Sequence, residues 1–220
     1  MTDALTLRTR WQDALVAARG GAPGPDPAPY ADNLLARWAE PQRRYHTTAH
    51  LTQVLDHVDL LAGHAGHAGH AGHPDLVRLA VWFHDAVYRP DRTENEERSA
   101  ALAERALPEA GVPDAGVAEV ARLVRLTVTH DPAAGDTDGE VLCDADLAVL
   151  AAGPKEYAAY AAQVREEYGF VPDDAFREGR AAVLRQLLGL PRLFRTPHGA
   201  AEWEPRARQN LTTELELLTR

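Results

Sequence analysis

A histidine and an aspartate stand side by side inside the most apolar helical segment of this sequence. Residues 75–88 place apolar side chains around nearly the whole circumference of the expected helix, which is typical of a buried helix. His84 and Asp85 lie within that segment. Burying an imidazole and a carboxylate is costly unless a partner compensates. The pair is therefore predicted either to bind a divalent cation or to form a hydrogen-bonded pair in the core.

Two further side chains are expected to face the same interior. His50 borders the apolar stripe of an expected helix over 46–62, and Asp146 lies on the apolar face of an expected helix over 145–151. Two imidazoles and two carboxylates suit Mn, Fe, Co, Ni or Zn better than an all-oxygen site would, and Mg stays a candidate. A metal with open positions can activate a water for hydrolysis of a phosphate ester.

Two other histidines, His46 and His130, are weaker candidates, whereas a third, His57, is not one. His46 lies one helical turn before His50 and shares its face. His130 ends an expected helix over 115–130 on its core side, where a structural role is the alternative to metal binding. His57 lies about 10 Å beyond His50 along the helix axis, too far to share one ion, so we expect it to be a surface or structural residue.

The elements that must position these residues are predicted to be helices throughout. Apolar residues recur at helical spacing, and no strand alternation persists beyond a few residues. Asp144 is expected to cap the helix that carries Asp146. No linker is long enough to separate domains, so we expect one all-α domain over 1–220. The expected helices cover 3–19, 30–39, 46–62, 75–88, 94–107, 115–130, 145–151, 154–168, 173–189 and 201–218.

The segment 62–73 repeats Ala-Gly-His four times. A glycine in each triplet disfavours an α-helix by about 1 kcal/mol relative to alanine. The insert is interpreted either as a flexible connection between helices or as a weak, exposed metal-capturing loop. Its histidines are His64, His67, His70 and His73.

Composition limits the classes of partner. The formal net charge of −10 argues against an extended nucleic-acid partner, because phosphate backbones require clustered cations. No apolar run approaches the length of a membrane span, and the first twenty residues carry charges throughout. The only cysteine, Cys143, cannot form an internal disulfide. We expect a cytoplasmic protein with no membrane partner; its oligomeric state is left open.

The ordered pattern of histidine, histidine-aspartate and aspartate resembles the HD superfamily of metal-dependent phosphohydrolases. Its local contexts are Tyr-His-Thr-Thr-Ala-His-Leu, Val-Trp-Phe-His-Asp-Ala-Val-Tyr and Asp-Ala-Asp-Leu. Three more segments, over about 41–215 in all, look like one bacterial subgroup of predicted HD phosphohydrolases. They are Glu94 to Ala100, Thr127 with His130, and Arg206 to Leu215.

The resemblance implies an HD-type helical bundle that hydrolyses a small phosphorylated molecule, such as a nucleotide, with a metal-activated water. It implies that Asp85 is both a ligand and a catalytic residue. Glu94 or Glu97 would assist proton transfer, the alternative being that both only form an acidic cluster in the first turn of a helix. The implied metal ligands are His50, His84, Asp85 and Asp146. Candidates for binding the substrate phosphate are His130 and three arginines, the alternative for the arginines being that they are simply solvated. These arginines are Arg43, Arg44 and Arg89.

Two other functions stay open at this point. The first is a non-catalytic sensor of metal or nucleotide, or a metal-handling protein that uses the histidine repeat. The second is a di-iron oxygenase of the HD type, which would need His46 and His130 as additional ligands.

Overall fold

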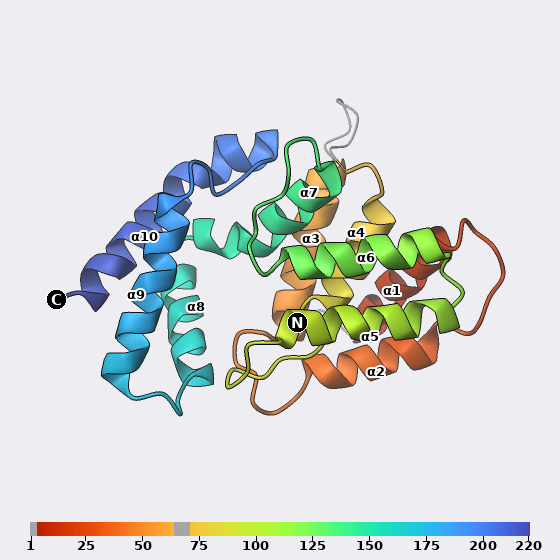
Figure 1. Ribbon diagram of the computed structural model, residues 1–220, viewed down its shortest axis with the longest axis horizontal. Helices are drawn as coiled ribbons and strands as arrows, with labels where there is room; N and C mark the ends of the chain where they lie inside the picture. Colours follow the sequence, from red (N-terminus) through yellow and green to blue (C-terminus); the bar gives the residue numbers. More distant parts are fainter. Residues whose placement is uncertain (1–3, 64–70) are drawn as a thin grey trace.

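The computed structural model describes residues 4–63 and 71–220, drawn in Figure 1 as helices joined by loops. The prediction of an all-α fold is confirmed, since no strand occurs in these described residues. The α-helices are α1 (Ala4–Ala18), α2 (Ala28–Trp38), α3 (Thr48–Gly63), α4 (Pro74–Phe83), α5 (Asn95–Glu109), α6 (Asp114–Leu126), α7 (Thr137–Leu147), α8 (Pro154–Glu167), α9 (Asp173–Gly189) and α10 (Glu204–Leu218). A 3₁₀ helix, η1 (Ala148–Ala151), follows α7, and a π-helix, η2 (Gly199–Trp203), precedes α10.

Three histidines of the Ala-Gly-His repeat, His64, His67 and His70, lie outside the described residues. No helix within the described ranges is both long enough and apolar enough to span a lipid bilayer.

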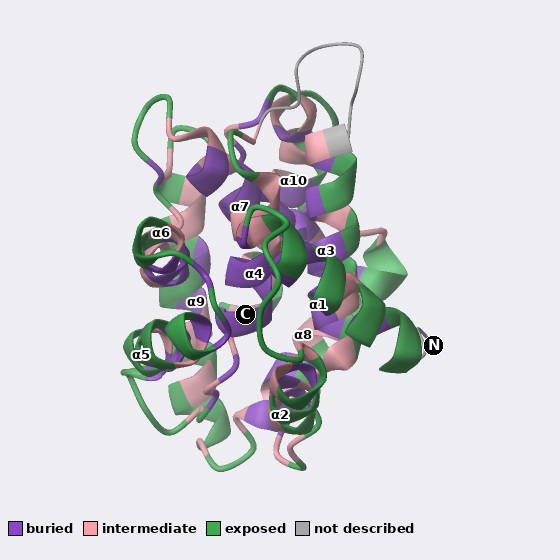
Figure 2. Ribbon diagram, turned by 90° about the vertical axis from the view of Figure 1, so that its right-hand side faces the viewer, coloured by how far each residue is buried: buried purple, intermediate pink, exposed green. Residues whose placement is uncertain are grey.

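The first hydrophobic core surrounds α4, as its apolar circumference predicts. Helices α1, α3, α6 and α7 contact α4, and Figure 2 shows it buried at the centre of the molecule. Trp82 of α4 packs edge-on against Trp11 at a centroid distance of 5.5 Å. Its carbonyl oxygen accepts a hydrogen bond from Trp38 Nε1 at 3.0 Å. The helix that precedes the histidine–aspartate doublet is therefore held on all sides.

A second hydrophobic core lies among η1, α8, α9 and α10. Figure 1 shows α8, α9 and α10 together on one side of the molecule, and α7, which contributes to the first core, leads towards them. Trp203 packs against both cores. The prediction of a single domain stays a prediction. The buried residues of the second core are Leu150, Ala151, Tyr157, Leu184, Leu193, Phe194, Ala207 and Leu211.

The start of α7 differs from the prediction. The helix begins at Thr137 rather than at residue 145, because the Asp136 carboxylate caps it by accepting a hydrogen bond from the Gly139 N–H at 3.0 Å. A Cβ atom at position 139 would collide with that carboxylate, so a glycine at this position permits the cap. Asp144 lies inside α7 and is buried, so the prediction that it caps the helix was wrong.

Asp144 instead fixes the segment that leads into η2. Its carboxylate accepts hydrogen bonds from the N–H groups of Arg195 and Thr196, both at 2.8 Å, and from the Thr196 hydroxyl at 2.6 Å. Burial raises the pKa of Asp144 to about 6, although these hydrogen bonds oppose the rise. The buried carboxylate thereby joins α7 to the chain that enters the second core.

Candidate metal centre

The His84–Asp85 doublet sits at the C-terminal end of α4, where the chain turns away from the helix. The sequence predicted a helix over 75–88, but α4 ends at Phe83. His84 keeps helical dihedral angles (φ −53°, ψ −39°), and its N–H donates to Ala80 O at 2.9 Å. Because the helix stops there, the two side chains need not diverge by the angle between adjacent helical residues. His84 Nε2 and Asp85 Oδ2 lie 3.1 Å apart.

Contacts with α5 fix the chain after the doublet, which contains no glycine or proline up to Tyr88. The Ser99 hydroxyl accepts a hydrogen bond from the Val87 N–H at 3.0 Å. The Asn95 side-chain oxygen accepts one from the Arg89 N–H, also at 3.0 Å. These contacts satisfy backbone donors that a continuing helix would have paired internally. The end of α4 is therefore set by tertiary structure.

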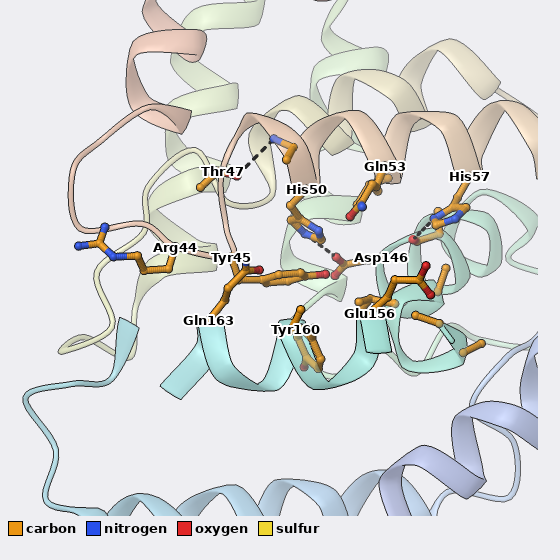
Figure 3. A pocket seen from close by; sticks show the side chains of 18 of the residues that line it. Arg44, Tyr45, Thr47, His50, Gln53, His57, Asp146, Glu156, Tyr160 and Gln163 are labelled. Atoms are coloured by element: carbon orange, nitrogen blue, oxygen red, sulfur yellow. Dashed lines mark hydrogen bonds and ion pairs between the residues drawn. The ribbon is translucent and has the colours of Figure 1, made fainter. Parts of the chain in front are cut away.

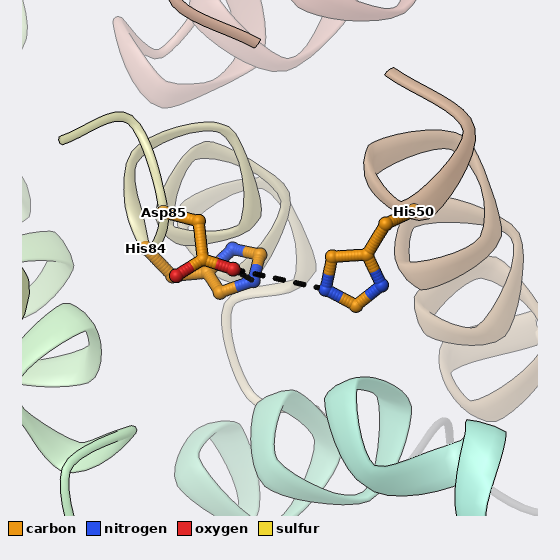
Figure 4. A group of neighbouring side chains, drawn as sticks. All are labelled: His50, His84 and Asp85. Atoms are coloured by element: carbon orange, nitrogen blue, oxygen red, sulfur yellow. Dashed lines mark ion pairs between the residues drawn. The ribbon is translucent and has the colours of Figure 1, made fainter. Parts of the chain in front are cut away.

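His50 of α3 and Asp146 of α7 complete the group of predicted ligands. His50 Nε2 lies 3.2 Å from Asp146 Oδ1 and 3.8 Å from Asp85 Oδ2. His84 Nε2 lies 3.5 Å from the same Asp146 oxygen. One ligand atom from each of His50, His84 and Asp85 falls within 4.8 Å of the others, and Figure 4 shows these three side chains converging. The four ligands predicted from the sequence are thus neighbours in space.

The hydrogen bonding of His84 fits a metal ligand. Its Nδ1 lies 2.8 Å from Val81 O, and a carbonyl oxygen can only accept, so Nδ1 carries a proton. Its Nε2 is buried and makes no hydrogen bond to any residue in the described ranges, although Asp85 and Asp146 oxygens lie close by. An imidazole nitrogen left unpaired among carboxylate oxygens is the arrangement that a divalent cation would satisfy.

Burial opposes the charged forms in this cluster, and the outcome differs between side chains. For His50 burial prevails and lowers the pKa of the imidazole. For His84 the carboxylates of Asp85 and Asp146 outweigh burial and hold its pKa well above the ordinary value. The same attraction, chiefly to His84, overcomes burial and holds the pKa values of Asp85 and Asp146 below their ordinary values. Both carboxylates therefore stay ionised near neutral pH and favour a cation.

His130 lies beside Asp146, outside the inner group. The helix predicted over 115–130 ends at Leu126, and His130 adopts a left-handed conformation (φ 50°) with its N–H donating to Leu126 O at 3.0 Å. Its Nε2 lies 2.8 Å from Asp146 Oδ2. The other oxygen of Asp146 faces His50 and His84, so His130 orients this carboxylate from behind.

His46 is held away from the inner group by a residue that the sequence did not single out. Its Nδ1 lies 2.6 Å from Glu167 Oε2, and its ring lies over Tyr88 at a centroid distance of 4.3 Å. Glu167 ends α8, where the helix dipole disfavours a negative charge. An acidic residue at that position was the available signal, but its partner lies 121 residues away in the sequence.

Two cavities meet at the cluster. The first, called the doublet cavity, has a volume of about 640 Å³ and is lined by His46, His84, Asp85, His130 and residues of α8 and α9. The second, called the α3 cavity, has a volume of about 540 Å³ and includes Gln53, His57 and Trp203; Figure 3 shows several of its side chains. His50, Asp146, Tyr45 and Tyr160 line both cavities. His57, expected to be a surface or structural residue, is half-buried, with Nδ1 3.3 Å from Ala145 O.

The structure does not bring the two predicted proton-transfer residues to the cluster. Both oxygens of Glu97 lie 2.7 Å from the Arg125 guanidinium on the outer surface. Glu94 is exposed just before α5, and neither residue lines the doublet cavity. Glu96, between them, does line it. On a helix, residues one or two apart face different directions, and the sequence did not indicate which face meets the cluster.

The predicted phosphate-binding arginines also take other positions. Arg43 is buried between the rings of Trp38 and Tyr88, 5.3 Å from each centroid, and donates to His46 O. Arg89 pairs with a neighbouring aspartate and lies outside the doublet cavity. Arg44 lines only the α3 cavity. The doublet cavity has two arginines of its own, Arg92 and Arg180.

Arg92 and Arg180 differ in their pairing. Arg180 is engaged by Glu214, at 2.8 and 3.0 Å, and by the Tyr160 hydroxyl. Arg92 has an exposed side chain with one distant ion pair, 3.8 Å from Asp91.

Comparisons with known proteins found no relative of this chain. No protein-family model, no curated protein and no solved structure matches this chain.

Proposed function

We propose that this protein is a metal-dependent phosphohydrolase of the HD type that acts on a small phosphorylated molecule such as a nucleotide. The observation that carries the proposal is the convergence of two imidazoles and two carboxylates from α3, the end of α4 and α7. They form part of the wall of a cavity large enough for a small molecule. A cytoplasmic location, inferred from the sequence, is part of this proposal.

Each residue has a separate task in the proposed reaction. His50, His84, Asp85 and Asp146 would hold the ion, and a mixed nitrogen and oxygen set suits Mn, Fe, Co, Ni or Zn. A bound divalent cation supplies Lewis-acid polarisation and neutralises charge during hydrolysis of a phosphate ester. Arg92 offers a positive charge in the solvent-accessible part of the cavity.

The test is metal content measured by elemental mass spectrometry, followed by phosphate release from a panel of phosphomonoesters, phosphodiesters and nucleotides. The histidine repeat can bind metal by itself, so all proteins carry asparagine at positions 64, 67 and 70. Asp85→Ala is compared with Asp32→Ala, which removes an exposed carboxylate that pairs with Arg8.

We expect about one metal ion per chain and phosphate release in the parent protein and in Asp32→Ala, and neither in Asp85→Ala. A parent protein that binds none of Mn, Fe, Co, Ni, Zn or Mg would show that the doublet is a structural pair. Metal binding without turnover on any substrate class would instead favour a sensor.

A further inference from the structure

Glu167 is a buried carboxylate with an unusually complete set of hydrogen bonds. Its side chain is 0% exposed. Oε1 accepts from three consecutive backbone N–H groups, those of Arg44, Tyr45 and His46, at 2.7, 2.9 and 3.0 Å. Oε2 accepts from the Tyr88 hydroxyl at 2.8 Å and lies 2.6 Å from His46 Nδ1. Five donors around one carboxylate fix its position firmly, so it can orient the imidazole ring among them.

The ring so oriented belongs to His46. Its Nδ1 faces Glu167, and one ring face lies over Tyr88. The opposite nitrogen, Nε2, makes no hydrogen bond to any residue within 4–63 or 71–220, and it is not among the buried unpaired atoms. His46 lines the doublet cavity and keeps 21% of its side chain exposed. The free nitrogen is therefore left in contact with that cavity.

The position of His46 distinguishes it from the metal ligands. It does not belong to the group whose ligand atoms lie within 4.8 Å of one another, and its ring centre lies 5.6 Å from that of His50. An imidazole that only stabilised the fold would not need a free nitrogen facing a cavity. An imidazole oriented by a carboxylate on one side and open on the other is a typical contact for a ligand oxygen.

We propose that His46 contacts the substrate through Nε2, next to the metal centre, and that Glu167 is the positioning residue that fixes this ring. The group contacted is an oxygen of the phosphorylated substrate, since the doublet cavity holds both His46 and the candidate ligands. This inference rests on the proposed function.

Two substitutions at position 46 distinguish the contributions of the two ring nitrogens of His46. In His46→Asn the amide lies where Nδ1 was and can still bond to Glu167, but nothing replaces Nε2. In His46→Gln the amide reaches towards the position of Nε2. His73→Asn is the matched control, because His73 Nδ1 also faces a carboxylate, that of Asp138 at 2.9 Å, and lies outside both cavities.

The experiment measures metal per chain by elemental mass spectrometry and binding of inorganic phosphate by calorimetry, on metal-loaded full-length protein. As in the test of the proposed function, every protein including the reference carries His64→Asn, His67→Asn and His70→Asn. We expect His46→Asn to keep its metal and to bind phosphate about tenfold more weakly, a change equivalent to about 1.4 kcal/mol or one hydrogen bond. His46→Gln should lose less affinity than His46→Asn, and His73→Asn should match the wild type.

The role of Glu167 is tested by a double-mutant cycle on the same affinity. Glu167→Gln should weaken phosphate binding in the wild type but have no further effect in His46→Asn, because its contribution acts through that ring. A purely structural Glu167 would give additive losses.

Four results would overturn the inference: unchanged phosphate affinity in His46→Asn, loss of metal in His46→Asn, additive losses in the cycle, or no phosphate binding by the metal-loaded wild type. The first three leave the proposed hydrolase intact. A wild type that binds no metal removes both proposals, and metal analysis alone identifies that case.

Discussion

Protonation of Glu167 should destabilise the protein in a defined pH range. Burial alone would raise its pKa, but the His46 imidazole and the N–H groups of Arg44 and His46 outweigh burial and lower the pKa to about 2 from an ordinary 4.5. The gap of about 2.5 corresponds to about 3 kcal/mol of folding free energy. Because the folded-state pKa is the lower one, this stability is complete above pH 4.5 and is lost as the pH falls towards 2.

The perturbation is Glu167→Gln, which mimics the protonated acid. It should lower the free energy of unfolding by about 3 kcal/mol at pH 7. At pH 3 the wild type has already lost about 2 kcal/mol of this contribution, so the difference between the two proteins should shrink to about 1 kcal/mol. Other carboxylates titrate in both proteins, and their effect cancels in the difference.

The assay is urea unfolding of both proteins at several pH values between 3 and 7, with Glu166→Gln as the control. Glu166 is the adjacent residue, but it is exposed and pairs with Arg44 only at 3.7 Å. Its substitution should cost less than about 1 kcal/mol at every pH. A cost for Glu167→Gln that does not change with pH would refute the reasoning, because the ionised carboxylate would then not be the stabilising species.

Three further outcomes are expected. Glu97→Gln should leave both the free energy of unfolding and the metal content nearly unchanged, because its ion pair with Arg125 is exposed; a loss of metal would show that Glu97 contributes to the metal centre. Gly139→Ala should lower that free energy by roughly 1–3 kcal/mol, because its Cβ would collide with the capping Asp136, and an unchanged thermal midpoint would contradict this account of α7. Removing the metal with a chelator should also destabilise the protein. The expected loss is about 4 kcal/mol relative to protein at a free metal concentration a thousand times the dissociation constant. A melting temperature that does not change when the chelator is added would count against the metal site.

The sequence predicted the helices well where apolar spacing and breakers agree. The helix expected over 173–189 is α9, Asp173–Gly189, with the same ends. The start of α7 could not be predicted, because a glycine and several polar residues indicate a loop until the Asp136 cap is seen. The end of α4 could not be predicted either. The backbone N–H groups that follow this helix donate hydrogen bonds to the side chains of Ser99 and Asn95, which belong to α5.

The residues of the site were likewise predicted where residue type and spacing suffice, and missed where contacts distant in the sequence decide. Histidines and aspartates at apolar helical positions were predicted to meet, and the four candidate ligands do lie together. Glu167 was missed because its role depends on a loop more than a hundred residues away. The roles expected of Glu94 and Glu97 lack geometric support, because their direction depends on how α5 is rotated. Residue type and spacing identified the cluster, but long-range contacts decide what surrounds it.

One wall of the doublet cavity comes from a different part of the chain than the candidate ligands do. Phe176 and Val183 of α9 line the cavity, whereas the ligands belong to α3, the end of α4 and α7. Over evolutionary time, substitutions along α9 can reshape the cavity without disturbing the ligands. The end of α8 lacks that freedom, because Glu167 is tied to the loop before α3. Substitutions in α9 should therefore change the shape of this cavity more readily than substitutions in the last turn of α8.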